Sequence, residues 1–92
     1  MTTFVIERNI PGASELTTEQ LRDITITSNA VVDGLGVPYT WHHSYVAGDK
    51  VYCVHEADDA ETIREHARRG GFPADLVVEV AAMIDPRTGE DR

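Results

Sequence analysis

Histidine and cysteine side chains are concentrated in one stretch of the chain, where together they could bind a metal ion. Imidazole nitrogen and thiolate sulfur are ligands that zinc, nickel and copper bind well. None of these residues stands in a recognised metal-binding motif such as C-x-x-C or H-E-x-x-H. A lone cysteine is also common as a small buried residue, and two histidines can simply hydrogen-bond each other. Both interpretations stay open for His42, His43, Cys53, His55 and His66.

Catalytic arrangements have less support. Ser44 follows two histidines, but it does not stand in the strand-turn-helix context of a nucleophile elbow. A general base could be one of the glutamates Glu7, Glu56 and Glu79, but nothing in the sequence singles one out. We identify no catalytic residue and no cofactor-binding residue. The sequence therefore favours a binding protein over an enzyme, without deciding between them.

Four strands and two helices are expected to position these side chains. The first helix has a clear start, because Thr17 and Gln20 stand at capping-box spacing. The second helix begins at Asp58 or Asp59, and a pair of glycines ends it at position 70. Runs of β-branched and aromatic residues predict the strands. We expect strands at 3–10, 39–47, 50–57 and 75–84, and helices from 17 to 34 or 36 and from 58 to 70.

The order strand-helix-strand-strand-helix-strand predicts an α+β fold, the ferredoxin-like sandwich. Two interleaved right-handed β-α-β crossovers give a four-stranded antiparallel sheet with both helices on one face. We expect a single domain over residues 1–92, with an ordered core at about 3–86 and a polar tail at 87–92. The other face of the sheet, the open face, is left without a covering element.

The hairpin turn at 48–49 determines which side chains of its two strands share a face. In this register His42 lies directly opposite His55 on the side of the helices, where two imidazoles could share an ion. Cys53 lies on the same face, and His66 points toward the sheet from the second helix. Aliphatic side chains expected under the helices are Phe4, Ile6, Leu76, Val78 and Val80.

The open face is expected to carry Trp41, His43 and Tyr45 among other apolar side chains. A soluble monomer rarely leaves such a patch in water. A twofold dimer that stacks two open faces would cover it, so we expect a homodimer. His43 could meet Glu7 or Glu56 there, and the twofold axis would duplicate these ligands into a six-coordinate nitrogen and oxygen site.

Charge and composition exclude several classes of partner. Sixteen acidic residues against eight basic ones give a net charge of −8, which opposes binding to nucleic acid. No apolar run is long enough to cross a membrane. The single cysteine and the lack of a basic segment followed by an apolar stretch at the N-terminus favour a cytoplasmic protein.

Several runs of residues resemble a known family over nearly the whole chain. The family consists of small bacterial proteins, is catalogued as a domain of unknown function with a ferredoxin-like fold, and includes an actinobacterial protein described as a dimeric nickel-binding protein. The most specific run is the one at 64–75. The matching runs are FVIER at 4–8, SYV at 44–46, DKVYCV at 49–54, REHARRGGFPAD at 64–75 and IDP at 84–86.

This resemblance implies the ferredoxin-like fold, a homodimer and nickel binding. Glu7, Cys53 and His66 lie inside the matching runs, so a ligand role could be carried over to them. The other three histidines stand where relatives are expected to have different residues. The resemblance therefore implies no complete ligand set.

Our leading hypothesis is a dimeric cytoplasmic protein that binds nickel, or zinc or another divalent ion, for sequestration or sensing. One alternative is a small dimeric α/β-barrel enzyme or small-molecule-binding protein, with a histidine-lined pocket between sheet and helices. Another is an interaction module without a site. The expected metal ligands are His43, Cys53, His55, His66, His42 and Glu7.

Overall fold

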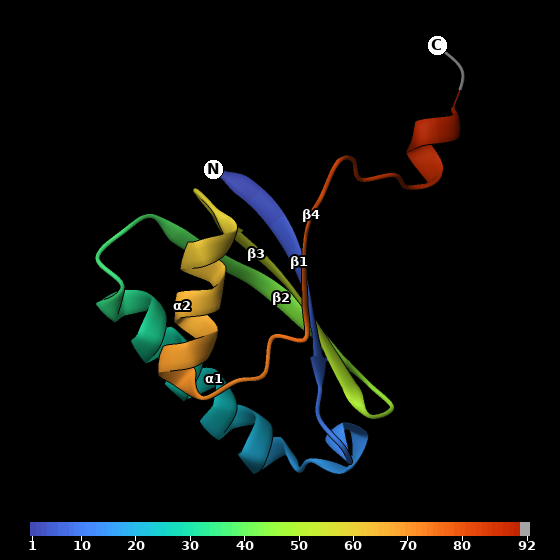
Figure 1. Ribbon diagram of the computed structural model, residues 1–92. Coiled ribbons are helices and arrows are strands. Elements are labelled where there is room, and N and C mark those ends of the chain that lie inside the picture. Colours follow the sequence, from blue (N-terminus) through green and yellow to red (C-terminus); the bar gives the residue numbers. More distant parts are fainter. Residues whose placement is uncertain (91–92) are drawn as a thin grey trace.

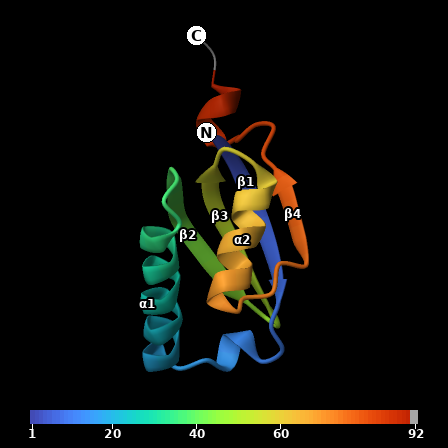
Figure 2. The same ribbon diagram turned by 60° about the vertical axis from the view of Figure 1, so that its left-hand side comes forward.

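A computed structural model describes residues 1–90 of the chain. Its sheet has the strand order β2-β3-β1-β4 with antiparallel neighbours throughout, and both helices lie on one face (Figures 1 and 2). The expected ferredoxin-like fold is therefore confirmed. The elements are β1 (Thr2–Asn9), η1 (Ala13–Glu15), α1 (Thr18–Gly34), β2 (Tyr39–Ala47), β3 (Lys50–Ala57), α2 (Ala60–Gly70), β4 (Leu76–Glu79) and η2 (Pro86–Gly89), of which η1 and η2 are short 3-10 helices.

The ends of the helices follow from local sequence. At the start of α1, the Gln20 amide donates to Thr17 Oγ1 at 3.1 Å and the Thr17 amide donates to Gln20 Oε1 at 2.9 Å, which completes the expected capping box. At the start of α2, Asp59 accepts a hydrogen bond from the Thr62 amide at 2.8 Å. At its end, Gly71 has a φ of 72°. This is a left-handed conformation that is less favourable in free energy for residues with a Cβ.

Replacing Gly71 by alanine is expected to lower the free energy of unfolding by about 1 kcal/mol, because the left-handed conformation brings a Cβ close to the following carbonyl. Gly34→Ala is the matched control, because Gly34 is helical and a Cβ there meets nothing within 4 Å. The control is expected to be neutral or to stabilise by up to about 1 kcal/mol. Urea unfolding of both variants measures the difference, and equal effects would contradict this explanation of the helix end.

A β-bulge in β2 changes the expected register of the hairpin. The turn at 48–49 is as expected, but the register shifts between Trp41 and His43, so that Trp41 rather than His42 lies opposite His55. The expected pairing of His42 with His55 is therefore wrong. The extra residue moves Trp41 to the helix side of the sheet, and it directs His42 to the open face, where its ring meets Glu56.

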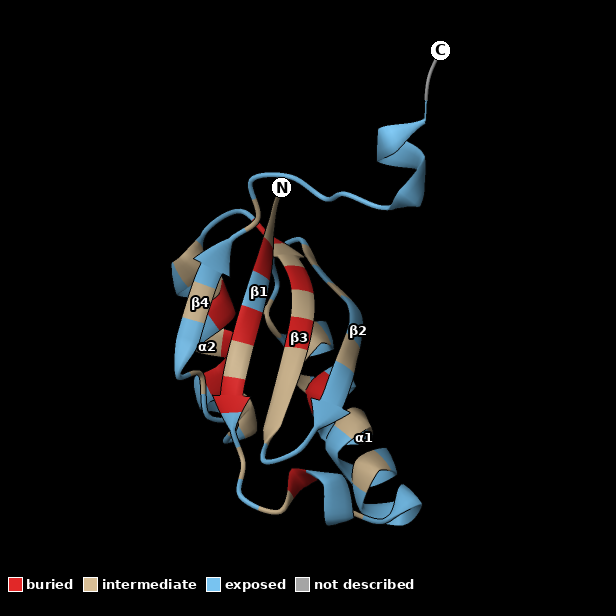
Figure 3. Cartoon of the chain, turned by 90° about the vertical axis from the view of Figure 1, so that its right-hand side faces the viewer, coloured by how far each residue is buried: buried red, intermediate tan, exposed pale blue. Residues whose placement is uncertain are grey.

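The last strand is shorter than the expected 75–84, and its faces are reversed. Val77 lies beside Ile6 and packs against the core, whereas Leu76 and Val78 lie half-exposed on the open face. Figure 3 shows β4 mostly in the colour of exposed residues. The expectation that Leu76 and Val78 lie under the helices is therefore wrong, because pairing with β1 determines the phase of this strand. The Val80 amide makes a last bond to β1, and every residue from 81 to 90 is exposed. The end of the expected tail, 91–92, lies outside the described residues.

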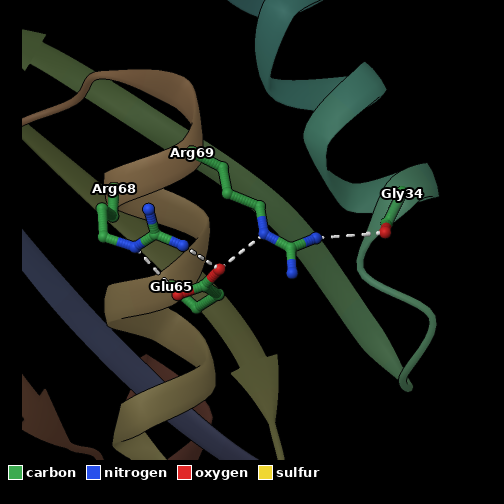
Figure 4. A network of polar contacts seen from close by, with 4 residues as sticks. All are labelled: Gly34, Glu65, Arg68 and Arg69. Atoms are coloured by element: carbon green, nitrogen blue, oxygen red, sulfur yellow. Dashed lines mark hydrogen bonds and ion pairs between the residues drawn. The ribbon is translucent and has the colours of Figure 1, made fainter.

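The core lies between the sheet and α2, whose Ile63 is fully buried. Helix α1 packs mainly against α2. The charged residues at the end of α2 join the two helices: Glu65 accepts hydrogen bonds from Arg68 and Arg69, and Arg69 Nη1 donates to the Gly34 carbonyl of α1 at 3.1 Å (Figure 4). Within residues 1–90, no helix combines the length and the apolar character needed to span a membrane.

Candidate functional site

The six expected metal ligands lie on two opposite sides of the sheet. Three are buried under the helices and three lie on the open face. In the described part of the chain, no three histidine, cysteine, aspartate or glutamate side chains come together as a metal site. A single copy of residues 1–90 therefore offers only partial ligand sets. The buried three are Cys53, His55 and His66, and the open-face three are Glu7, His42 and His43.

Two buried histidines form the centre of the helix-side group. The rings of His55 and His66 lie 5.1 Å apart between centroids, and both are almost completely inaccessible. Tyr39 Oη lies 2.5 Å from His55 Nδ1, and Ser28 Oγ lies 2.9 Å from His66 Nε2. The His66 ring makes stacked contacts with the rings of Tyr39 and Phe72. Each imidazole is thus fixed by a hydroxyl group on one nitrogen.

Burial keeps both imidazoles neutral. It lowers the pKa of His55 to about 3 and that of His66 to about 4, with a further lowering from the positive charge of Arg8. Burial also raises the pKa of Tyr39 far above its usual value, so its hydroxyl stays protonated, and we assign it as donor to His55 Nδ1. We assign the Ser28 hydroxyl as donor to His66 Nε2, which places the proton of His66 on Nδ1. That Nδ1 is buried and has no hydrogen-bond partner in the described structure.

Arg8 is buried beside this group with only 4% of its surface exposed. Its Nε donates to Cys53 Sγ at 3.3 Å, its Nη1 donates to the Pro73 carbonyl at 2.6 Å, and its guanidinium lies 5.5 Å from the centre of the Phe72 ring. Among residues 1–90 no carboxylate pairs with it. Arg8 was not among the residues predicted from the sequence, although alternation in β1 places it on the same face as Phe4 and Ile6.

A cavity of about 250 Å³ lies between α1 and the helix side of the sheet and is partly open to solvent. Its walls are mainly apolar, and its charged or imidazole-bearing part is formed by Arg8, His55 and His66. The hydroxyl and thiol side chains in the wall are Thr25, Ser28, Ser44 and Cys53. A Cβ on Gly70 would overlap the ring of Phe72, so glycine at this position lets that ring lie along the cavity wall. The apolar wall residues are Ile10, Leu16, Leu21, Ile24, Trp41, Val46, Val51 and Phe72.

On the open face, the bulge brings a histidine next to a carboxylate. His42 Nε2 lies 3.0 Å from Glu56 Oε2, and both side chains are accessible to solvent. His43 lies beside Tyr45, with 5.1 Å between ring centroids. Glu7 forms an ion pair with Lys50 at 3.1 Å instead of meeting a histidine. The imidazole and carboxylate that meet are therefore those of His42 and Glu56, whereas the sequence pointed to His43.

The two sides differ in their suitability for a cation. The positive charge of Arg8 lies against Cys53 and near both buried imidazoles, so a metal ion there would experience repulsion in a medium of low dielectric constant. One nitrogen of each buried ring is also engaged by a hydroxyl. On the open face, the negative Glu56 lies beside an accessible imidazole. A cation is therefore favoured on the open face and an anion under the helices.

Comparisons with known proteins find a matching family model and a solved structure of similar fold. A family model described as "Nickel responsive protein SCO4226-like" matches residues 4–80. Among solved structures, SCO4226 from Streptomyces coelicolor A3(2) matches with a TM-score of 0.73 and 24% sequence identity, over 89% of this chain and 99% of that one. At this identity the structural match shows the fold. Among curated proteins, no significant match was found.

Proposed function

The chain belongs to the family of SCO4226-like nickel-responsive proteins, and from this premise we propose that it binds nickel(II) on the open face of its sheet, as a homodimer. Binding there would let the protein sequester or sense the ion. The proposed compartment is the cytoplasm, where a buried free thiol such as that of Cys53 stays reduced.

The observation that carries this proposal is the exposed pair of His42 and Glu56, whose ligand atoms lie 3.0 Å apart. Imidazole and carboxylate are both ligands that nickel(II) accepts, in square-planar or tetragonal nitrogen and oxygen sites. One chain offers one such pair, so its site is incomplete. A second copy related by a twofold axis would supply the same pair again, and His43 of each chain extends the donor set.

Apolar side chains elsewhere on the open face support a dimer through the same face. Val5, Tyr45, Leu76 and Val78 lie on the open face with between 38% and 63% of their surface exposed. Stacking two open faces would remove these side chains from water and duplicate the ligands at once. The net charge of −8 further favours the approach of cations.

Calorimetric titration of metal-free protein with nickel tests the site. His42→Ala and Glu56→Gln are each expected to weaken nickel binding by more than the roughly 10–100-fold that loss of an outer-sphere partner costs. Asp33→Asn is the control for Glu56→Gln, because it also replaces a carboxylate by an amide but at an exposed position on α1. It is expected to leave the nickel affinity unchanged.

Two results would contradict the proposal. One is nickel affinity that survives the double replacement of His42 and Glu56. The other is affinity that is lost in Cys53→Ala while both open-face variants keep it, which would place the ion under the helices. A parallel titration with zinc measures which of the two ions the site prefers.

A further inference from the structure

We propose that the cavity between α1 and the sheet binds a small monocarboxylate with an apolar body, and that Arg8 holds its charge. This site lies under the helices, whereas the proposed nickel ligands lie on the opposite face of the sheet. The inference therefore stands independently of metal binding. It rests on a buried cation, a buried unpaired nitrogen and the size and lining of the cavity.

The guanidinium of Arg8 is largely buried, and residues 1–90 supply no carboxylate partner for it. The two groups that accept its hydrogen bonds are the Cys53 sulfur and the Pro73 carbonyl, and neither is a carboxylate. Its Nη2 donates no hydrogen bond within the described residues. A buried ion without a counter-charge is unfavourable, so a bound carboxylate would stabilise this arrangement. Arginine also suits carboxylates because its planar fork of donors matches their two oxygens.

His66 supplies a second donor on the same part of the wall. Its Nδ1 is buried without a partner among the described residues. In the tautomer assigned above, with Nε2 accepting from Ser28, that nitrogen carries the ring proton. The ring of Phe72 joins the two groups, since the guanidinium of Arg8 lies 5.5 Å and the ring of His66 5.7 Å from its centre. One positive charge and one neutral donor match a single carboxylate better than a dianion.

The rest of the cavity fits an apolar body of limited size. A dry apolar cavity of about 150 Å³ is enough to hold benzene, and the volume here is about 250 Å³. Room therefore remains for one six-membered ring, or a chain of similar length, together with the carboxylate. His55 and His66 are neutral and fixed by hydroxyl groups, so the arrangement supports binding and gives no indication of a general base.

Trp41 is the only tryptophan and lines the cavity, so its fluorescence reports occupancy directly. The probes are cyclohexanecarboxylate, the neutral cyclohexanecarboxamide and the cationic cyclohexylamine, titrated into metal-free full-length protein. The carboxylate is expected to bind at least tenfold more tightly than the amide, and the amine is expected not to bind. Equal affinity for acid and amide, or no response to the acid up to about 10 mM, overturns the proposal.

Arg8 variants separate charge recognition from shape. Arg8→Met keeps most of the volume and is expected to abolish the tenfold preference for the acid, whereas Arg8→Lys is expected to retain part of it. A preference that persists in a folded Arg8→Met protein overturns the role of Arg8. If that variant does not fold, the comparison of acid with amide on the unaltered chain still decides the outcome.

A second pair of variants tests the location. Ile24→Phe fills the cavity and is expected to weaken binding of the carboxylate at least tenfold. Ile26→Phe makes the same change on an exposed part of α1 outside the cavity and is expected to have no effect on this binding. Equal effects of the two place the ligand elsewhere. His42→Ala is expected to leave carboxylate binding intact, and Arg8→Met to leave nickel binding intact, so failure of one proposal is distinguishable from failure of the other.

Discussion

Replacing Val5 by aspartate is expected to dissociate the proposed dimer and to weaken nickel binding together with it. Val5 occupies the centre of the open face, between Val54 of β3 and Val78 of β4. A twofold interface would bury two copies of the new carboxylate, and each unpaired buried charge costs several kcal/mol. The dimer is therefore expected to weaken at least a hundredfold, as measured by sedimentation velocity. Nickel affinity should fall in parallel because each separated chain keeps one pair of ligands.

Ile26→Asp provides the control for this experiment, since Ile26 is an exposed apolar residue on α1, away from the open face. It is expected to change neither the sedimentation coefficient nor the nickel affinity. A Val5→Asp protein that remains dimeric would show that the chain associates through another surface. A monomeric variant with unchanged nickel affinity would show that one copy suffices for the site.

Acid is expected to destabilise the protein strongly between pH 6.5 and 4.5. The pKa values of His55 and His66 are about 3 and 4 in the folded chain, below their ordinary value of 6.5. In this window the unfolded chain binds a proton at each histidine and the folded chain does not, so the free energy of unfolding rises with pH. Each histidine accounts for about 2–3 kcal/mol over these two pH units. Since whole domains are stable by roughly 5–15 kcal/mol, the loss is large.

Carboxylates contribute to the pH dependence of the free energy of unfolding in a lower range of pH. The pKa values of Asp59 and Glu65 are lowered by hydrogen bonds to Thr62 and to arginine, so their stabilisation is lost mainly below pH 4.5. Urea unfolding of metal-free protein at a series of pH values isolates the histidine effect. His66→Gln is expected to reduce proton uptake on unfolding by about one. NMR titration of the His66 imidazole provides a second readout, and a ring that protonates near pH 6.5 in the folded protein would contradict this explanation.

Local signals in the sequence were sufficient for the order of the elements and for the helix ends. The capping box at Thr17 and the glycines after α2 act within a few residues, so their effect is visible in the sequence. The phase of β4 depends on pairing with β1, and an apolar run such as LVVEV fits either phase. The bulge at His42 has no local marker, since neither glycine nor proline stands there.

The candidate sites were predictable only in part, for the same reason. Residue types identified the histidines, but a single inserted residue in β2 decided that His42 meets Glu56 instead of His55. Arg8 escaped notice because its burial becomes apparent only when the face of β1 and the cover of α2 and Phe72 are known. A charged residue that alternates in phase with Phe4 and Ile6 was the available signal.

The sheet thus separates two kinds of chemistry in one small domain. Its open face carries an accessible imidazole and carboxylate, the ligand pair of the proposed nickel site. Its helix side carries a buried guanidinium and two neutral imidazoles around a cavity suited to an anion. In a nickel-responsive protein this arrangement would allow a metal and an organic acid to bind to the same chain without competing for ligands.

Anomalous diffraction at the nickel absorption edge, from crystals grown with nickel, tests this account most directly. We expect a peak between two open faces, within bonding distance of His42 and Glu56 from both copies. A peak surrounded by Cys53, His55 and His66 beneath the helices would contradict the separation of the two sites and, with it, the roles assigned to Arg8 and to the open face.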